Sequence, residues 1–184
     1  MAAKQKRIAL MGFRSVGKSS VTIQFIEKQF VDSYDPTIEN TFHKTLKIKG
    51  QDYSLEVVDT AGQDEYSILP QSYYISIDGY VLVYSVNSRK SFEVIKIVYE
   101  KLLDMKGSSN IPIVLVGNKT DLQNDRVVSA EEGRKLAAEW KINFLETSAK
   151  DFRSVNEVFI QIIQAIERAE GGGTPEKQGG CSVS

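Results

Sequence analysis

Short apolar runs bounded by turn residues recur along the chain and predict buried strands. Four of them cover residues 8–11, 55–58, 80–86 and 113–116. Each run has the length of a strand that is buried on both faces of a sheet. Residues 41–48 instead alternate apolar and polar side chains, and a turn at residues 49–51 leads into residues 53–58. This second pattern predicts an antiparallel hairpin at a sheet edge.

Segments with helical spacing lie between the predicted strands. Their apolar residues recur three and four positions apart in residues 92–103, 136–140 and 155–166. The alternation of strands and helices predicts an α/β fold in which a mostly parallel sheet is covered by helices on both faces. Ligands of such sheets bind at the carboxyl ends of the strands.

Length and charge fit one globular domain with a tail. The chain has 184 residues, of which 41% are hydrophobic. Lys and Arg number 23 against 24 for Asp and Glu, so no broad attraction to nucleic acid is expected. Residues 1–170 are predicted to form the domain. Residues 171–184 are rich in glycine and poor in apolar side chains, which predicts a flexible tether.

The single cysteine lies close to the end of this tether. Cys181 is the fourth residue from the end, so no internal disulfide can form and a reducing compartment is expected. The basic residues at the start lead into an apolar run that is too short for a signal peptide or a membrane span.

Residues 12–19 match the pattern of a phosphate-binding loop. They follow a predicted strand and precede a helical run at residues 21–25, as that motif requires. The glycines let main-chain N–H groups face phosphates, Lys18 can reach the β and γ oxygens, and the Ser19 hydroxyl can bind Mg²⁺. A glycine turn that only ends a strand is the alternative. The loop alone does not choose between ATP and GTP.

A second candidate metal ligand follows the strand at residues 55–58. Asp59 stands where its carboxylate can reach Mg²⁺ through a water. Gly62 can present its N–H to a γ-phosphate, and Gln63 can orient an attacking water. The alternative is an aspartate that only begins a turn and has no role in metal binding.

Residues 30–40 are polar, contain a proline and have no periodicity, so they are predicted to form a loop. Thr37 could ligate Mg²⁺ only while a γ-phosphate holds this loop in place, which would make it an order–disorder switch. On the pattern alone, an exposed threonine without a role is the favoured interpretation. His43, the sole histidine, is expected to be solvated and without a role.

Two further motifs stand at predicted strand ends. They are Gly-Asn-Lys-Thr-Asp at residues 117–121 and Glu-Thr-Ser-Ala-Lys at residues 146–150. With these motifs the chain resembles the Ras superfamily of small GTPases over residues 6–170. Residues 29–40 and 59–67 are most similar to its Rheb subfamily. The resemblance implies a P-loop NTPase fold with a six-stranded sheet, one antiparallel edge strand, binding of GTP and GDP with Mg²⁺, slow GTP hydrolysis and a monomer.

The resemblance also implies individual roles. Asp121 accepts two hydrogen bonds from guanine, Asn118 ties its strand end to the phosphate loop, and Lys119 lies over the base. The implied nucleotide-binding residues are Arg14, Ser15, Val16, Gly17, Lys18, Ser19, Ser20, Phe30, Val31, Asp32, Tyr34, Thr37, Gly62, Asn118, Lys119, Asp121, Ser148, Ala149 and Lys150. The implied catalytic residues are Gln63, Lys18 and Thr37, and the metal ligands are Ser19, Thr37 and, through water, Asp59. The implied effector region is Tyr34, Asp35, Pro36, Thr37, Ile38, Glu39, Asn40, Thr41 and Phe42.

The last four residues fit a prenylation signal at Cys181, with a terminal serine that favours farnesyl. One prenyl chain without a polybasic run gives reversible anchoring. We therefore expect residence on the cytosolic face of endomembranes (lysosome, Golgi or ER) with a cytosolic pool. The implied partners are a GTPase-activating protein, which is the tuberous sclerosis complex in the Rheb subfamily, the TOR kinase complex as effector, and a prenyl-binding chaperone.

Arg14 stands where most members of the superfamily carry glycine. A long side chain there should interfere with the attacking water and with an activator's arginine, so we expect intrinsic hydrolysis at or below the order of 10⁻⁴ per second. Gln63 should then contribute less than usual. Two other functions stay open, an ATP-using kinase or ATPase and a GTP-holding module without turnover. The base preference at Asp121 separates the former from a GTPase, and timed phosphate release separates the latter.

Overall fold

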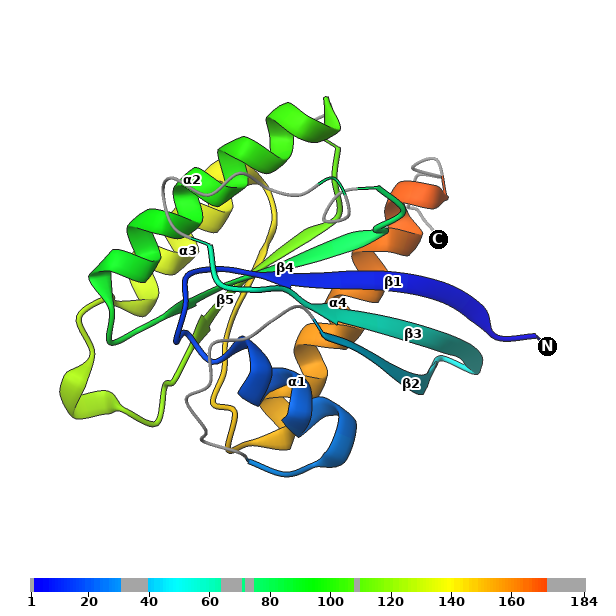
Figure 1. Cartoon of the computed structure of the whole chain (residues 1–184), viewed down its shortest axis with the longest axis horizontal. Helices are drawn as coiled ribbons and strands as arrows, with labels where there is room; N and C mark the ends of the chain where they lie inside the picture. Colours follow the sequence, from blue (N-terminus) through cyan, green and yellow to red (C-terminus); the bar gives the residue numbers. More distant parts are fainter. Residues whose placement is uncertain (1, 31–39, 64–70, 72–74, 108–109, 172–184) are drawn as a thin grey trace.

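The computed structural model describes residues 2–30, 40–63, 71, 75–107 and 110–171. Six strands form one sheet in the order β2-β3-β1-β4-β5-β6 (Figure 1). The strands are β1 Lys4–Met11, β2 Asn40–Ile48, β3 Gln51–Asp59, β4 Gly79–Ser85, β5 Ile113–Asn118 and β6 Asn143–Glu146. Strand β2 pairs antiparallel with β3, and the other pairs are parallel. The predicted sheet with one antiparallel edge strand is confirmed.

Helices cover both faces of this sheet, as predicted (Figure 1). They are α1 Lys18–Glu27, α2 Arg89–Lys106, α3 Ala130–Trp140 and α4 Phe152–Glu170, with a short 3₁₀ helix, η2, at Gln123–Asp125. Helices α2 and α3 lie on one face, and α1 and α4 lie on the other. None of the helices in the described ranges is long and apolar enough to cross a membrane.

The two apolar layers explain the uninterrupted hydrophobic runs. Successive side chains of a strand point to opposite faces, so Ala9 and Met11 pack under α2 and α3 while Ile8 and Leu10 pack under α1 and α4. All seven residues of β4 are buried. Because the central strands are covered twice, their positions favour apolar residues on both faces.

Most elements differ in extent from the apolar pattern, and in two of them polar groups set an end. Strand β4 stops one residue before the predicted end, since the N–H of Val86 donates to the Asn118 carbonyl and its carbonyl accepts from Val127 and Val128. Helix α2 begins three residues earlier than its first apolar residue because the Ser88 hydroxyl accepts the Ser91 N–H and caps it.

The edge strand β2 is the least buried strand of the sheet. Its residues alternate between exposed and half-buried, and none of them is fully buried. The His43 side chain is 71% exposed, with its Nε2 atom 3.4 Å from Glu56 on β3. Strand β2 therefore extends the sheet at its edge and contributes little to the core.

Candidate functional site

The phosphate loop joins the carboxyl end of β1 to helix α1 and needs glycine at two positions. A Cβ on Gly12 would lie 2.2 Å from the Val83 carbonyl oxygen of β4. Gly17 has a φ of 98°, and a Cβ there would lie 2.4 Å from the Asn118 amide nitrogen. Side chains at either place would push the loop away from the sheet. The loop can thus follow the strand ends closely and leave its main chain facing the open side.

Lys18 lies beneath this loop and is 5% exposed. Its ammonium group donates to the carbonyls of Gly12 and Phe13, at 3.2 and 3.1 Å. Burial lowers the pKa of Lys18 to about 8, although the nearby charge of Asp59 acts in the opposite direction. A desolvated cation held only by carbonyl dipoles is ready to exchange these partners for an anionic ligand, which would hold the charge more strongly.

Ser19 and Asp59 form a compact oxygen cluster beside Lys18. The Ser19 hydroxyl donates to Asp59 Oδ2 at 2.6 Å. Asp59 is 1% exposed, and burial raises its pKa in spite of the Ser19 hydrogen bond and the charge of Lys18. Its other oxygen, Oδ1, is buried and finds no hydrogen-bond partner in the described part of the chain. A hydroxyl and a carboxylate with an unused oxygen are ligands that suit Mg²⁺.

Gln63 is folded against the phosphate loop. Its side chain is 4% exposed, and its Oε1 atom accepts the Gly12 N–H at 2.9 Å. Its amide nitrogen donates to the Thr60 hydroxyl at 3.2 Å and to the Ala61 carbonyl. Both ends of this amide are therefore occupied by hydrogen bonds within the protein.

Gly62 and Arg14 are in direct contact. A Cβ on Gly62 would lie 2.6 Å from Arg14 Cα, so the two segments touch main chain to main chain. The exposed Arg14 guanidinium lies over the Phe13 ring, 5.0 Å from its centroid. The long side chain at the position of the family's glycine is thus held beside the loop by a cation–π contact.

The two motifs at the ends of β5 and β6 are joined to the phosphate loop by side chains. Asn118 is fully buried, and its amide donates to the Val16 carbonyl at 2.9 Å. The hydroxyl of Thr147, also fully buried, donates to Asn118 Oδ1 at 2.9 Å. Lys119 donates from Nζ to the Ser15 carbonyl at 2.8 Å. Three segments distant in sequence are therefore fixed to one another.

Asp121 faces a cavity between these segments. The Ser148 hydroxyl donates to its Oδ1 atom at 3.0 Å, and Lys150 lies 3.4 Å from its Oδ2 atom. Partial burial alone would raise the pKa of Asp121, but hydrogen bonds from Ser148 and Lys150 and the charge of Lys150 outweigh it and hold the pKa below its usual value. The carboxylate is thus an acceptor at neutral pH.

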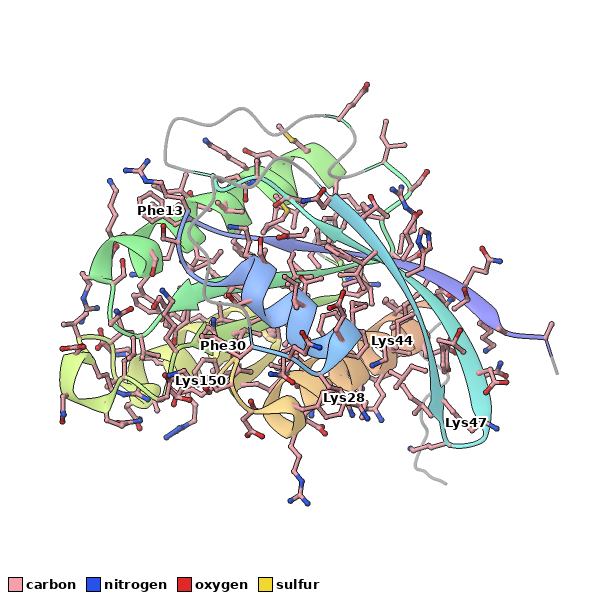
Figure 2. All side chains as sticks on the ribbon, turned by 60° about the horizontal axis from the view of Figure 1, so that its bottom comes forward. Phe13, Lys28, Phe30, Lys44, Lys47 and Lys150 are labelled. Carbon is pink, nitrogen blue, oxygen red and sulfur yellow. The ribbon has the colours of Figure 1, made fainter. Side chains whose placement is uncertain are left out.

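The cavity has a volume of about 210 Å³. Phe30 forms part of its wall, is 40% exposed, and lies beside Lys150, whose ammonium is 5.3 Å from the ring centroid (Figure 2). The residues that line it are Ser15, Gly17, Ser20, Phe30, Asn118, Lys119, Asp121, Leu122, Ala149 and Lys150. An aromatic ring, a carboxylate and the flank of the phosphate loop around one cavity suit a planar base that carries a polyphosphate.

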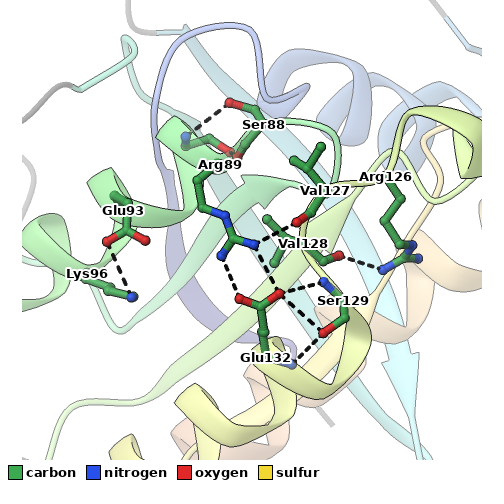
Figure 3. Close-up of polar contacts among 10 residues, drawn as sticks. Ser88, Arg89, Glu93, Lys96, Arg126, Val127, Val128, Ser129 and Glu132 are labelled. Atoms are coloured by element: carbon green, nitrogen blue, oxygen red, sulfur yellow. Dashed lines mark hydrogen bonds and ion pairs between the residues drawn. The ribbon is translucent and has the colours of Figure 1, made fainter.

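Two arginine–glutamate pairs brace the loops behind this cavity. Arg126 makes two hydrogen bonds to Glu146, at 2.8 and 2.9 Å, and both side chains are largely buried. Arg89 makes two to Glu132, at 2.6 and 3.2 Å, and one to the Val127 carbonyl (Figure 3). Hydrogen bonds from Arg89 and from the Ser129 main chain lower the pKa of Glu132 to about 2. The starts of α2 and α3 and the loop that precedes α3 are thus connected.

Several predicted site residues lie outside the described residues. They are Val31, Asp32, Tyr34, Asp35, Pro36, Thr37, Ile38, Glu39 and, at the end of the chain, Cys181. Of the implied effector region, Asn40 and Thr41 are exposed and Phe42 is half-buried at the start of β2. The structure brings together the remaining predicted residues along the carboxyl ends of β1, β3, β5 and β6.

Sequence reasoning missed several residues that hold the site in place. Thr147 was part of a predicted motif but had no assigned role. Gln24 lies in the predicted helical run after the phosphate loop, and its amide donates to the Ala149 carbonyl at 2.7 Å. A glutamine directly before the apolar Phe25 in this run is a signal that could have pointed to a buried polar contact. The two ion pairs join residues 20 and 43 positions apart and left no local signal.

A glycine-rich loop between a strand and a helix, with a buried lysine beneath it, defines a P-loop nucleotide-binding protein. The chain belongs to the Ras family, whose family model matches residues 7–168. It is 59% identical to the GTP-binding protein Rheb homolog of Drosophila melanogaster over 184 residues, which cover both chains completely. It is 59% identical to human GTP-binding protein Rheb over 181 residues, or 98% of each chain. Identity to the GTP-binding protein rhb1 of Schizosaccharomyces pombe is 52%, also over 98% of each chain.

Proposed function

We propose that the protein is a Rheb-like small GTPase that binds GTP and GDP with Mg²⁺, hydrolyses GTP slowly and signals as a molecular switch. Family membership and the names of its Rheb relatives support GTP binding and hydrolysis. The observation that carries the proposal is the Asp121 carboxylate, held by Ser148 and Lys150 at a cavity that continues into the phosphate loop. Guanine offers this carboxylate two N–H donors, whereas adenine offers no matching pair.

A substitution at Asp121 that changes the preferred base tests the assignment of guanine. Replacing Asp121 by asparagine turns one acceptor into a donor, so xanthine nucleotides should gain preference over guanine nucleotides by about 10²-fold or more. Competition of GDP, XDP and ADP against a fluorescent nucleotide measures the preference, with Asp125→Asn, on the exposed helix η2, as the matched control. Equal competition by ADP and GDP in the wild-type protein would instead support the ATP-using alternative.

The proposed metal ligands are Ser19, Thr37 and, through a water, Asp59. The unused Oδ1 atom of Asp59 and the short hydrogen bond from the Ser19 hydroxyl to its Oδ2 atom support the fit of Mg²⁺ to this place. Bound Mg²⁺ would neutralise phosphate charge there. Lys18 would donate to phosphate oxygens in place of its present carbonyl partners, and Gly62 would offer a main-chain N–H beside Arg14.

Slow hydrolysis follows from the arrangement of Gln63 and Arg14. The Gln63 amide must leave its bonds to Gly12 and Thr60 before it can orient a water, which costs free energy in each turnover. We therefore propose that Gln63 takes part in catalysis but contributes less than it does in most of the family.

Single-turnover GTP hydrolysis tests this proposal. We expect Gln63→Leu to slow hydrolysis by less than about tenfold, and Arg14→Gly to raise the rate by clearing space beside the loop. Nucleotide affinity of Gln63→Leu should stay within about twofold of the wild type, because Gln63 is not among the proposed nucleotide-binding residues. A loss of 10² or more in Gln63→Leu would show that this side chain works as it does in the rest of the family.

The regulators, effector and membrane address complete the proposal. By resemblance to the Rheb subfamily, the tuberous sclerosis complex would act as GTPase-activating protein and the TOR kinase complex as effector. The region Tyr34 to Phe42 would contact the effector. Cys181 would carry a farnesyl group on the tail that follows the G domain. A prenyl-binding chaperone would maintain a cytosolic pool, and the membrane-bound form would lie on the cytosolic face of lysosome, Golgi or ER. A Cys181→Ser variant should lose the membrane fraction.

A further inference from the structure

A second cavity lies at the end of the sheet opposite to the phosphate loop. It is formed where β5 and β6 begin and α4 ends, and its volume is about 480 Å³, compared with about 210 Å³ for the cavity at Asp121. We call it the distal groove, and the proposed nucleotide chemistry makes no use of it. It lies at the amino ends of the parallel strands, whereas the nucleotide cavity lies at their carboxyl ends.

The lining of the distal groove combines aliphatic side chains with two cations. Ile111, Ile113, Ile142 and Ala165 supply the apolar part of the wall. Lys141 and Arg168 supply the charge, and Asn143 adds an amide. Among the described residues, no carboxylate lines the groove, and neither Lys141 nor Arg168 forms an ion pair. This composition suits an anionic group that is attached to an apolar body.

The two cations also have an ordinary role to consider. Lys141 is the C-cap of α3 and Arg168 lies in the last turn of α4, where positive charge stabilises the helix dipole. That role requires neither a hollow between the two helix ends nor that both charges line it. An anion can therefore bind in the distal groove itself. The effect of the two charges on helix stability can be measured separately.

The position of the distal groove relative to the chain end suggests where the anion comes from. Arg168 and Ala169 line the groove, and α4 ends immediately afterwards at Glu170. Cys181 lies ten residues after Gly171, a stretch of chain that spans at most about 35 Å when fully extended. If Cys181 carries the lipid proposed above, on which this step rests, the end of the domain that holds the groove stays within that distance of the bilayer.

We propose that the distal groove binds the headgroup of an anionic phospholipid in the membrane to which the tail is attached. One prenyl chain gives only marginal membrane binding, so a second, weak signal changes the bound fraction strongly. Lys141 and Arg168 supply that signal because their positive charges are attracted to the negative surface of the cytosolic leaflet. A domain seated in this way has its nucleotide cavity turned away from the bilayer, which leaves the cavity open to soluble regulators.

Vesicle binding by the unprenylated full chain tests the site independently of lipidation and of GTP hydrolysis. The probes are vesicles of phosphatidylcholine alone and vesicles in which about a fifth of the lipid is phosphatidylserine. We compare the wild type with Lys141→Gln/Arg168→Gln and with a matched control, Arg134→Gln/Lys135→Gln, which removes the same charge from the exposed side of α3. Melting temperature and GDP retention of each variant report on the fold and on the nucleotide site.

Binding of the wild type to the anionic vesicles should fall about tenfold in the groove variant and less than about twofold in the control. Equal losses in the two variants would overturn the proposal, because they would show a general effect of net charge. If free phosphoserine bound the groove with the same affinity as the anionic vesicles do, the proposal would be overturned in favour of a soluble anion. Binding of an oligoglutamate peptide that depends on the groove, without binding of vesicles, would assign the groove to a protein partner instead.

Discussion

The phosphate end and the base end of the nucleotide site are built in different ways. At the phosphate end one continuous segment, residues 12–19, supplies the main chain and the buried Lys18. At the base end the cavity is formed by side chains from the ends of β5 and β6 and from α1, which are held together by hydrogen bonds across more than 100 residues. The first depends on local conformation, whereas the second depends on the whole fold.

This difference implies that the two ends respond differently to substitution. A change at the phosphate end should weaken all nucleotides equally, since the main chain recognises only phosphate. A substitution in the residues that support the base cavity should shift the position of Asp121. It should therefore change how long guanine stays bound in the cavity. The predictions below test this separation, beginning with the largest effect.

Lys18→Ala should lower the affinity for GDP by about 10²- to 10³-fold, because two charge-assisted hydrogen bonds to phosphate are lost. The ratio of affinities for GDP and XDP should stay unchanged, since Asp121 still reads the base. Equilibrium binding of both nucleotides measures the two quantities. A shift in that ratio would show that the two ends are coupled.

Glu146→Gln should speed the release of GDP by about tenfold, because it breaks a largely buried bidentate pair with Arg126. Arg126 then no longer holds the segment that contains Thr147 and Ser148 in place. Release of a fluorescent GDP analogue gives the rate, and GDP and XDP compared at equilibrium show whether base recognition is affected.

Two variants serve as controls for that prediction. Glu132→Gln breaks the more exposed pair with Arg89 and should change the rate by less than about threefold. In the double variant Arg126→Gln/Glu146→Gln, the change in the release rate should differ from the sum of the changes in the two single variants, since the residues act as one unit. An additive result would mean that the pair does not position the base loop.

Binding of GDP at pH 8 should take up about half a proton, since the pKa of Lys18 is about 8 in the free protein and rises when phosphate oxygens surround the ammonium. The uptake should vanish below about pH 7, where Lys18 is already protonated in the free protein. Calorimetry in buffers of different ionisation enthalpy measures it, and Lys18→Ala corrects for titration of the nucleotide. The base end should add nothing, because the pKa of Asp121 lies below its usual value.

The sequence was most informative where structure is local. The runs at residues 8–11 and 113–116 became β1 and β5, and the alternating residues 41–48 became the edge strand β2. The order of strand, glycine loop and helix was correctly predicted, because each part has its own residue pattern.

The parts that could not be predicted depend on partners far away in the chain. Nothing in the neighbourhood of Glu146 indicates that Arg126 faces it, and Gln24 reaches Ala149 only because α1 lies beside the segment that follows β6. The folded position of Gln63 against Gly12 also depends on how β3 lies beside β1. Spacing in a sequence can suggest which residues gather at a site, but the contacts that hold them come from the assembled sheet.

The outermost strand has a consequence for solubility. Strand β2 has one hydrogen-bonded neighbour in the sheet, so its far edge carries main-chain groups that another extended chain could pair with. Exposed polar side chains recur along this strand, and among them Lys47 is 68% exposed (Figure 2); a charge there disfavours stacking of one molecule's edge on another's. The same side chains that make β2 the least apolar strand thereby protect the protein against fibrous self-association at high concentration.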